Sequence, residues 1–306
     1  MSDPYFDNVS LLIPFEYSTA IPQDYSPNKK QLIPVGSVVP SPDSKYYGKA
    51  ALFDGWTGYV DIPPSVDFDF GTGDYTVEFW FNTKQVRSGA GDSAGYIRLL
   101  CPSKTVNQPS TFQIWIVNDD AEAYGPKGVV GIALPGGTGT TIHTTQPITD
   151  AQWHHVAFTR QSGETRCYLD GILKSQVTDT TQYSLAATEG FRIGARVDLR
   201  RNQFFYGSLQ DFRITKGVCR YTTNFTPPGS FLSSTNLTGT VLTTEGIPKS
   251  GMTVRCIDRN PKIQRMWTTK TDKFGHYSFL LPKGDYTILA QDDNGNLNDQ
   301  VKRVRN

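Results

Sequence analysis

Apolar residues along the chain recur at every second position far more often than at every third or fourth. Side chains of a strand point alternately to its two faces, so Val77, Phe79 and Phe81 would share one face of a strand over 75–81. A second run with this alternation covers residues 112–117. Shorter runs of the same kind follow at 153–159, 166–169, 191–194 and 209–215. The pattern predicts strands rather than helices.

Turn-forming residues separate these runs. Asp54-Gly55 and Asp170-Gly171 supply residues that tolerate a positive φ or hydrogen-bond to their own backbone. Many short strands divided by such turns are typical of a β-sandwich or a β-barrel. The length of 306 residues allows one large all-β domain with a smaller one attached.

A domain boundary is predicted at 226–230, where Pro227 and Pro228 lack the backbone N–H groups that a continuing strand needs. Five further strand-like runs follow it, at 237–242, 252–257, 266–271, 277–281 and 286–290. We therefore assign residues 1–232 to a first domain and residues 233–306 to a second.

Charge and composition exclude several classes of protein. With 30 Lys and Arg against 29 Asp and Glu, the formal net charge is +1, which argues against a nucleic-acid binder. The content of 37% hydrophobic residues argues against a disordered chain. Residues 236–306 carry 11 Lys and Arg against 7 Asp and Glu, a net charge of +4, while residues 1–235 carry 19 against 22, a net charge of −3. The basic end, with Lys302, Arg303 and Arg305, is either a set of solvated terminal charges or a contact for an acidic partner.

Membrane and secretion signals are missing from the sequence. No stretch approaches the roughly 18 consecutive apolar residues that span a bilayer, and the start lacks the basic and apolar regions of a signal peptide. We expect a soluble, unprocessed protein without membrane insertion. The cysteines are too scattered for a disulfide scaffold or paired zinc ligands, so we expect reduced thiols. They are Cys101, Cys167, Cys219 and Cys256.

A series of motifs runs through the first domain in this order: 46–55, 59–63, 70–80, 153–160, 168–171, 192–194 and 207–214. Across residues 46–227 they resemble the laminin-G-like, concanavalin A-type jelly-roll lectin module. In the second domain, the segments 246–248, 271–279 and 281–287 resemble the carboxypeptidase-regulatory, transthyretin-like β-sandwich. The resemblances imply an all-β chain, a jelly-roll sandwich followed by a small Ig-like or transthyretin-like sandwich.

Two further segments, 9–15 and 212–228, are similar to the version of this module in virion proteins of tailed bacteriophages. The resemblance implies a protein made in the bacterial cytoplasm and built into the virion as a homo-oligomer, with other virion proteins as partners. Host-surface polysaccharide is a further candidate partner. Cys219 stands where the family often has a small residue, and is either a cross-link between subunits or an idle thiol.

Some relatives of the jelly roll are glycosidases, which need two carboxyl groups about 5 to 9.5 Å apart. Asp67 and Asp69 have the spacing i, i+2, which spans about 6.6 Å on a strand, but they lie in a loop-like connection between runs. Glu78 has no acidic partner at residues 76 or 80, and His154 and His155 would point to opposite faces of a strand. We predict no catalytic residue and no enzymatic activity.

Relatives often hold one calcium ion at a loop rim through carboxylate oxygens. Here the candidate ligands are Asp119, Asp120 and Asp198, although aspartate is also an ordinary turn former. No other cofactor is indicated.

The loop 197–206 combines the guanidinium groups of Arg200 and Arg201 with aromatic residues that include Tyr206. Such a mixture is typical of binding surfaces for sugars or for a neighbouring subunit, and equally of an exposed turn before a buried strand.

Three functions remain open at this point. The first is a non-enzymatic structural protein of a phage particle, associated with the tail or decorating the head. The second is a glycan-binding, receptor-recognition adhesin of a tail fibre. The third is a polysaccharide depolymerase, for which Asp67 and Asp69 would be the residues to test.

Overall fold

The computed structural model describes residues 3–16, 22–84, 96–102, 113–117, 126–133, 141–196, 199, 203–231, 234–259, 266–282, 285–291 and 297–305. The fold is nearly all-β with antiparallel sandwich sheets, as predicted. The described residues hold one α-helix, α1 (Leu185–Glu189), and two 3-10 turns, η1 (Phe6–Asn8) and η2 (Val66–Phe68). No helix among them is long and apolar enough to cross a bilayer.

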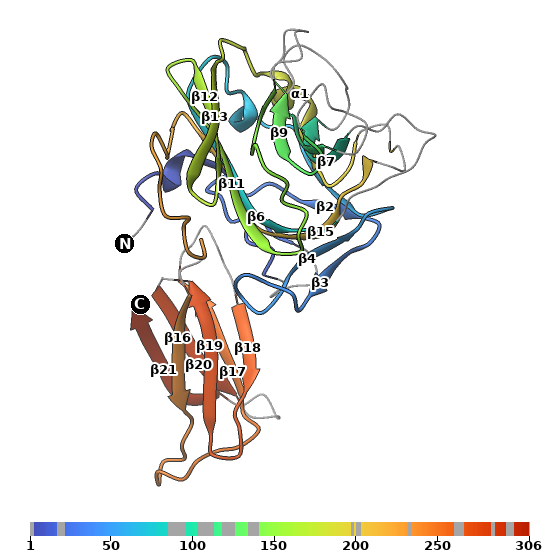
Figure 1. The fold of residues 1–306 in the computed structure, drawn as a ribbon. Helices are drawn as coiled ribbons and strands as arrows, with labels where there is room; N and C mark the ends of the chain where they lie inside the picture. The colour runs from blue at the N-terminus through green and yellow to red at the C-terminus, as the bar shows by residue number, and fades with distance from the viewer. Residues whose placement is uncertain are drawn as a thin grey trace. The chain divides into compact units, whose positions relative to one another are not determined.

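The chain divides into two compact units, residues 1–228 and 229–306, within the boundary segment 226–230 and four residues before the assigned domain limit of 232/233. The first unit contains an eight-stranded sheet with the order β13-β12-β11-β6-β15-β4-β3, and β1 pairs with β15 as its eighth strand (Figure 1). Its strands are β1 (Val9–Ile13), β3 (Val38–Ser41), β4 (Ala50–Asp54), β6 (Tyr75–Asn82), β11 (Trp153–Gln161), β12 (Glu164–Leu169), β13 (Ile172–Thr178) and β15 (Tyr206–Lys216).

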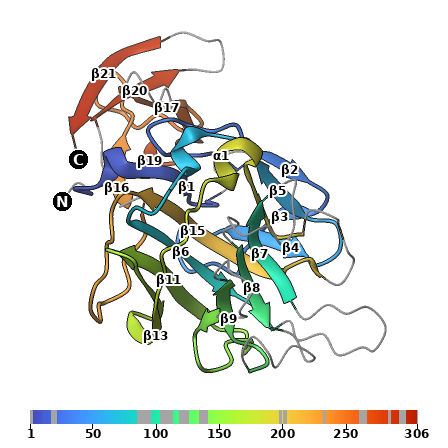
Figure 2. The same cartoon turned by 90° about the horizontal axis from the view of Figure 1, so that it is seen from above.

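A seven-stranded sheet with the order β10-β9-β8-β7-β14-β5-β2 forms the second layer of this unit (Figure 2). Its strands are β2 (Ile33–Val35), β5 (Tyr59–Ile62), β7 (Tyr96–Pro102), β8 (Gln113–Val117), β9 (Val130–Ala133), β10 (Thr141–His143) and β14 (Phe191–Ile193). The strands predicted at 75–81, 153–159, 191–194 and 209–215 are confirmed, with ends that differ by a few residues.

The core of the first unit lies between the two sheets. Val77, Phe79 and Phe81 are fully buried on one face of β6, as their alternation predicted. Phe79 stacks on Phe212 of β15, with ring centroids 5.1 Å apart, and Ile114 of β8 belongs to the same cluster. Burial of each such side chain stabilises the fold by about 1.5–3 kcal/mol.

The second unit contains a two-stranded sheet and a four-stranded sheet, with the order β18-β17-β20-β21 in the latter. Its strands are β16 (Ser234–Thr240), β17 (Thr253–Asp258), β18 (Met266–Lys270), β19 (His276–Pro282), β20 (Asp285–Gln291) and β21 (Leu297–Arg305). Val254, Cys256, Tyr286 and Ile288 form the centre of its core. This unit therefore has a hydrophobic core of its own.

The last strand was not expected from the sequence. Lys302, Arg303 and Arg305, which the sequence marked only as a basic end, lie in β21, and β21 pairs with β20 along most of its length. Arg303 pairs with Thr287 and Arg305 with Asp285 in this ladder. Their polar sequence gave no alternation of apolar residues, so the strand could be recognised only from its pairing.

Candidate functional site

The outer face of the eight-stranded sheet is covered at its centre by residues 218–228, which we call the strap. The strap follows β15 and turns back across the sheet. Thr76 Oγ1 donates a hydrogen bond to the Val218 carbonyl at 2.9 Å, and the Phe225 N–H donates to the Gly171 carbonyl at 2.8 Å. A Cβ atom on Gly171 would lie 1.8 Å from the Phe225 carbonyl oxygen, so the two backbones are in direct contact.

Aromatic side chains hold the strap against the sheet. The rings of Tyr221 and Phe225 stack with centroids 3.6 Å apart and planes 6° apart. Phe225 in turn packs edge-on against Tyr168 at 5.3 Å and against His155 at 5.9 Å. The strap thus packs against buried side chains of this sheet face, among them His155 and Tyr168.

An ionic cluster centred on Glu78 lies beneath the strap. Arg213 donates two hydrogen bonds to Glu78 Oε1, from Nε at 2.8 Å and from Nη2 at 2.6 Å, and the Tyr221 hydroxyl donates to Oε2 at 2.8 Å. His155 Nε2 lies 3.3 Å from Glu78 Oε2, without hydrogen-bond geometry. Arg220 Nε lies 3.8 Å from Oε1. Two guanidinium groups therefore flank one carboxylate.

The charges of this cluster decide what Glu78 can do. Burial by itself would raise the pKa of Glu78, but the charge of Arg213, the contact with His155 and the charge of Arg220 lower this pKa to about 2. Asp3 completes the cluster, at 2.8 Å from Arg220 and 3.2 Å from Arg213. Glu78 is consequently ionised at neutral pH, whereas the acid of a glycosidase needs a raised pKa to hold its proton.

Asp67 and Asp69, the acidic pair that the sequence offered for catalysis, make local structural contacts. The Asp67 carboxylate forms an ion pair with Lys30 and accepts a hydrogen bond from Asn28 Nδ2 at 2.9 Å. Burial alone would raise the pKa of Asp67, but these bonds lower it. Asp69 Oδ1 accepts the Gly71 N–H at 3.2 Å and so closes its own turn. Asp67 therefore lacks the raised pKa of a catalytic acid.

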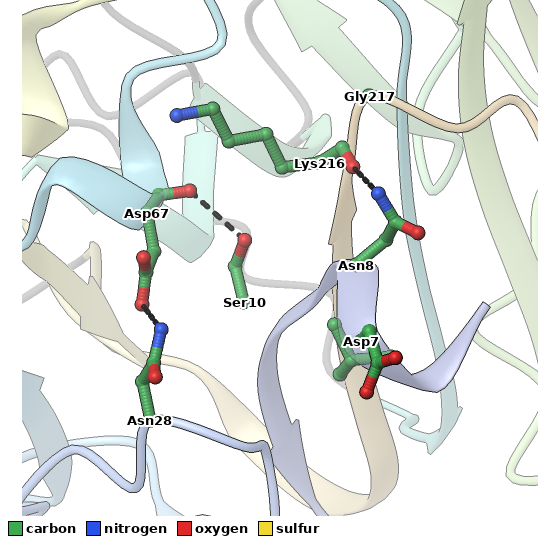
Figure 3. Close-up of a pocket in the computed structure, with 8 residues that line it drawn as sticks. Asp7, Asn8, Ser10, Asn28, Asp67, Lys216 and Gly217 are labelled. Atoms are coloured by element: carbon green, nitrogen blue, oxygen red, sulfur yellow. Dashed lines mark hydrogen bonds between the residues drawn. The ribbon is translucent and has the colours of Figure 1, made fainter.

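Asp67 also lines a polar pocket of about 290 Å³ at the far end of β15 from Tyr206. Ser10 Oγ donates to the Asp67 carbonyl at 2.9 Å, and Asn8 Nδ2 donates to the Lys216 carbonyl at 3.3 Å. Figure 3 shows Asp7 on the opposite side of the pocket from Asp67. These bonds join η1 to the end of β15 and β1 to η2, so several polar groups of the pocket are engaged in holding the fold together.

The adjacent histidines lie on opposite faces of β11, as predicted. His154 Nδ1 is 2.7 Å from Asp170 Oδ2, and its Nε2 is 3.2 Å from Asp150 Oδ1. The hydrogen bond with Asp170 raises the pKa of His154. His155 lies instead under the strap, with its ring 5.2 Å from that of Trp80. Both histidines therefore take structural roles.

A different surface, at the end of the sandwich where β15 begins, presents aromatic side chains to solvent. Tyr206 is 39% exposed and pairs directly with Asp54 in the β15–β4 ladder. The turn that follows Asp54 carries Trp56, which is 58% exposed. The sequence reasoning named Tyr206 but missed Trp56, for which the available signal was a tryptophan placed directly after the turn pair Asp54-Gly55. We call Trp56 and Tyr206 the aromatic rim.

The other candidate residues, Asp119, Asp120, Asp198, Arg200 and Arg201, lie outside the described residues. The calcium site and the arginine pair thus stay predictions. Within the described part of the chain, no group of three or more His, Cys, Asp or Glu side chains could hold a metal ion.

All four cysteines are free thiols in the structure. Cys219 lies in the strap and is half-buried, and its thiol donates to the Tyr221 carbonyl at 3.2 Å. Burial raises the pKa of this thiol, which keeps it in the less reactive protonated form.

Comparisons with known proteins agree with this fold. The family model of the concanavalin A-like lectin/glucanases superfamily matches residues 53–220. No curated protein matches the chain.

Solved structures resemble the chain at low sequence identity. One of them is domain 4 of AbnA, an extracellular GH43 arabinanase from Geobacillus stearothermophilus, solved in complex with arabinotriose. It is 18% identical to this chain with a TM-score of 0.50, and the match covers 69% of this chain and 94% of that domain. The binding domain of botulinum neurotoxin serotype D/C is 12% identical with a TM-score of 0.50, over 98% of this chain and 73% of that domain. At these identities the likeness concerns the fold. Because the family model spans more than half of its residues, the chain belongs to the concanavalin A-like lectin/glucanases superfamily.

Proposed function

We propose that this chain is a non-enzymatic, lectin-like module that binds carbohydrate. The observation that carries the proposal is the strap. It covers the sheet face on which Glu78 lies, and it adds Arg220 and Tyr221 to the groups that hold this glutamate as a buried carboxylate. Glycoside hydrolysis needs a second carboxyl group and a protonated acid, and Glu78 supplies neither. Of the two activities in the superfamily name, binding fits this geometry better than hydrolysis.

The similar structures support the same choice. The arabinanase domain was solved with arabinotriose, and the toxin module is a binding domain. Each belongs to a larger protein in which the sandwich serves as an attached module. We extend carbohydrate binding to this chain by analogy of fold, together with its membership of a superfamily that includes lectins.

A glycan array with the full chain tests this function. We expect binding to a subset of glycans, and no new reducing ends when the chain is incubated with the polysaccharides that contain them. Running the array with calcium and with a chelator would also test the predicted calcium ligands. Absence of binding under both conditions would contradict the function, and release of reducing ends that Asp67→Asn or Asp69→Asn abolishes would establish the depolymerase instead.

The finer part of the proposal is that the module is carried on a tailed-phage particle, as a structural protein or as a tail-fibre adhesin. The support is the sequence resemblance of residues 9–15 and 212–228 to phage virion proteins. In this chain β1 pairs with β15, with Val9 opposite Thr215 and Ile13 opposite Phe212, so the two segments form one structural feature. If the two resemblances were unrelated chance similarities, we would not expect them to fall on segments that pair with each other.

Immunogold electron microscopy of purified particles tests this location. We expect antibodies against the chain to label particles at one repeated position, on the tail or on the head. Label that stays in the soluble fraction, with bare particles, would rule out a virion protein while leaving carbohydrate binding intact.

A further inference from the structure

We propose that the aromatic rim is the sugar-contacting site, and that its ligand is a pyranose ring with equatorial hydroxyl groups, stacked on the indole of Trp56. The inference rests on the proposed carbohydrate binding and gives it a place and a class of ligand. In such a ring the axial C–H groups form an apolar face and the hydroxyls form a polar edge. The electron-rich face of an indole attracts C–H groups of this kind.

Exposure sets Trp56 apart from the tryptophans of the sheets. Trp56 is 58% exposed, whereas Trp80 is 5% and Trp115 is 3% exposed. A single exposed apolar side chain is common on protein surfaces and is not evidence of a site by itself. What distinguishes Trp56 is the turn that holds it.

The turn at 54–58 is rigid. The Asp54 carboxylate accepts three successive backbone N–H groups through Oδ1, from Trp56 at 2.9 Å, Thr57 at 2.9 Å and Gly58 at 2.8 Å. Its Oδ2 accepts the Thr57 hydroxyl at 2.6 Å. Burial alone would raise the pKa of Asp54, but these bonds lower it, so the carboxylate stays charged and the turn stays closed at neutral pH.

A second turn supports the first from the side. The Ser37 N–H donates to Thr57 Oγ1 at 3.1 Å. A Cβ atom on Gly36 would lie 2.1 Å from the Thr57 carbonyl oxygen, and one on Gly58 would lie 2.2 Å from the Ser37 carbonyl oxygen. The two turns thus pack backbone against backbone, with no flexible side chain between them. A platform ordered before binding loses little conformational entropy when the ligand arrives.

Tyr206 adds a second aromatic group at the same corner. Side chains directly opposite each other in a ladder have Cβ atoms about 5 Å apart, and Tyr206 is opposite Asp54. Ser37 in the adjoining turn adds a hydroxyl side chain, whereas the Thr57 hydroxyl is bonded within the turns. Two exposed aromatic side chains beside polar turns suit a ligand with one apolar face and a polar edge. A stable protein partner, by comparison, would need about 800 Å² of largely continuous contact surface on each side, which is more than two aromatic side chains provide.

The test uses the full chain and defined trisaccharides: cellotriose and triacetylchitotriose as equatorial pyranose probes, and arabinotriose as a furanose comparison. We expect at least one pyranose probe to bind in calorimetry, and Trp56→Ala to weaken this binding at least about tenfold. Trp56→Phe should keep part of the affinity. Phe274→Ala removes a side chain of similar exposure, 55%, from the second unit and should leave the affinity unchanged. Asn28→Ala tests the polar pocket as the alternative site.

The outcomes separate the site from the function. Unchanged affinity of a folded Trp56→Ala variant, or its loss in Asn28→Ala alone, would overturn the site while carbohydrate binding stands. No binding of the pyranose probes by the wild-type chain would overturn this inference, and an array without any binding would remove the function as well. If sedimentation shows a dimer that Trp56→Ala dissociates, with sugar affinity intact, the rim is a contact between copies and the inference is wrong. Circular dichroism of each variant verifies that it is folded.

Discussion

Replacing Glu78 by glutamine is expected to lower the free energy of unfolding of the first unit by about 3 kcal/mol. The substitution keeps the shape of the side chain but removes the charge that Arg213 contacts through two hydrogen bonds. Arg213 is buried, and its ion pair with Asp3, at 3.2 Å, is longer than the pair with Glu78, at 2.6 Å. Urea unfolding of the full chain, followed by tryptophan fluorescence, measures the change.

Glu164→Gln is the matched control for this prediction. Glu164 pairs with Arg166 at the surface of the same sheet, where its side chain is 38% exposed, and such pairs contribute about 0–1 kcal/mol. If Glu78→Gln unfolds at the same urea concentration as Glu164→Gln, the cluster beneath the strap does not stabilise the fold.

Acidification of the wild-type chain gives a second measure of the same cluster. Glu78 has a pKa of about 2 in the folded state, below its ordinary value of 4.5. A lowered pKa means that the carboxylate contributes its full stability above pH 4.5, and that this contribution declines as the pH falls toward 2. The wild type should therefore lose stability over this interval more steeply than Glu78→Gln. Parallel slopes for the two proteins would show that Glu78 does not titrate in this way.

Gly171→Ala is expected to detach the strap and to lower the stability of the first unit by about 3 kcal/mol. The new Cβ would lie 1.8 Å from the Phe225 carbonyl oxygen and 2.9 Å from its carbon, in a backbone with a φ of +79°. Because backbone atoms cannot move aside as a side chain does, the strap must shift, and the hydrogen bond from the Phe225 N–H to Gly171 is lost. Limited proteolysis should then cut the strap.

Gly48→Ala separates the clash from the backbone strain. Gly48 has a similar φ of +72°, but a Cβ there would meet nothing within 4 Å. This variant should lose only about 1 kcal/mol and keep the strap resistant to protease. Equal losses in the two variants would mean that strain at positive φ, and not the contact with Phe225, explains the effect.

The strands could be predicted well because their signal is local. Val77, Phe79 and Phe81 alternate with polar or outward-facing residues, and this alternation sets which face of β6 enters the core. β21 was not predicted, because its polar sequence lacks this signal. Of the aromatic rim, Tyr206 was named from the residue types of its loop, and its role in binding stays a prediction. Trp56 was missed because turn chemistry predicts the turn but not what packs against it.

The sequence by itself determined the all-β class, most strand positions and the lectin-like family, because these depend on alternation and on motifs within short segments. The tertiary structure decided the role of Glu78. Sequence alternation placed this carboxylate on the outer face of a strand, and Tyr221, 143 positions away, closes over it. Burial and charge pairing depend on which distant segments come into contact, and the alternation of apolar and polar residues does not show these contacts.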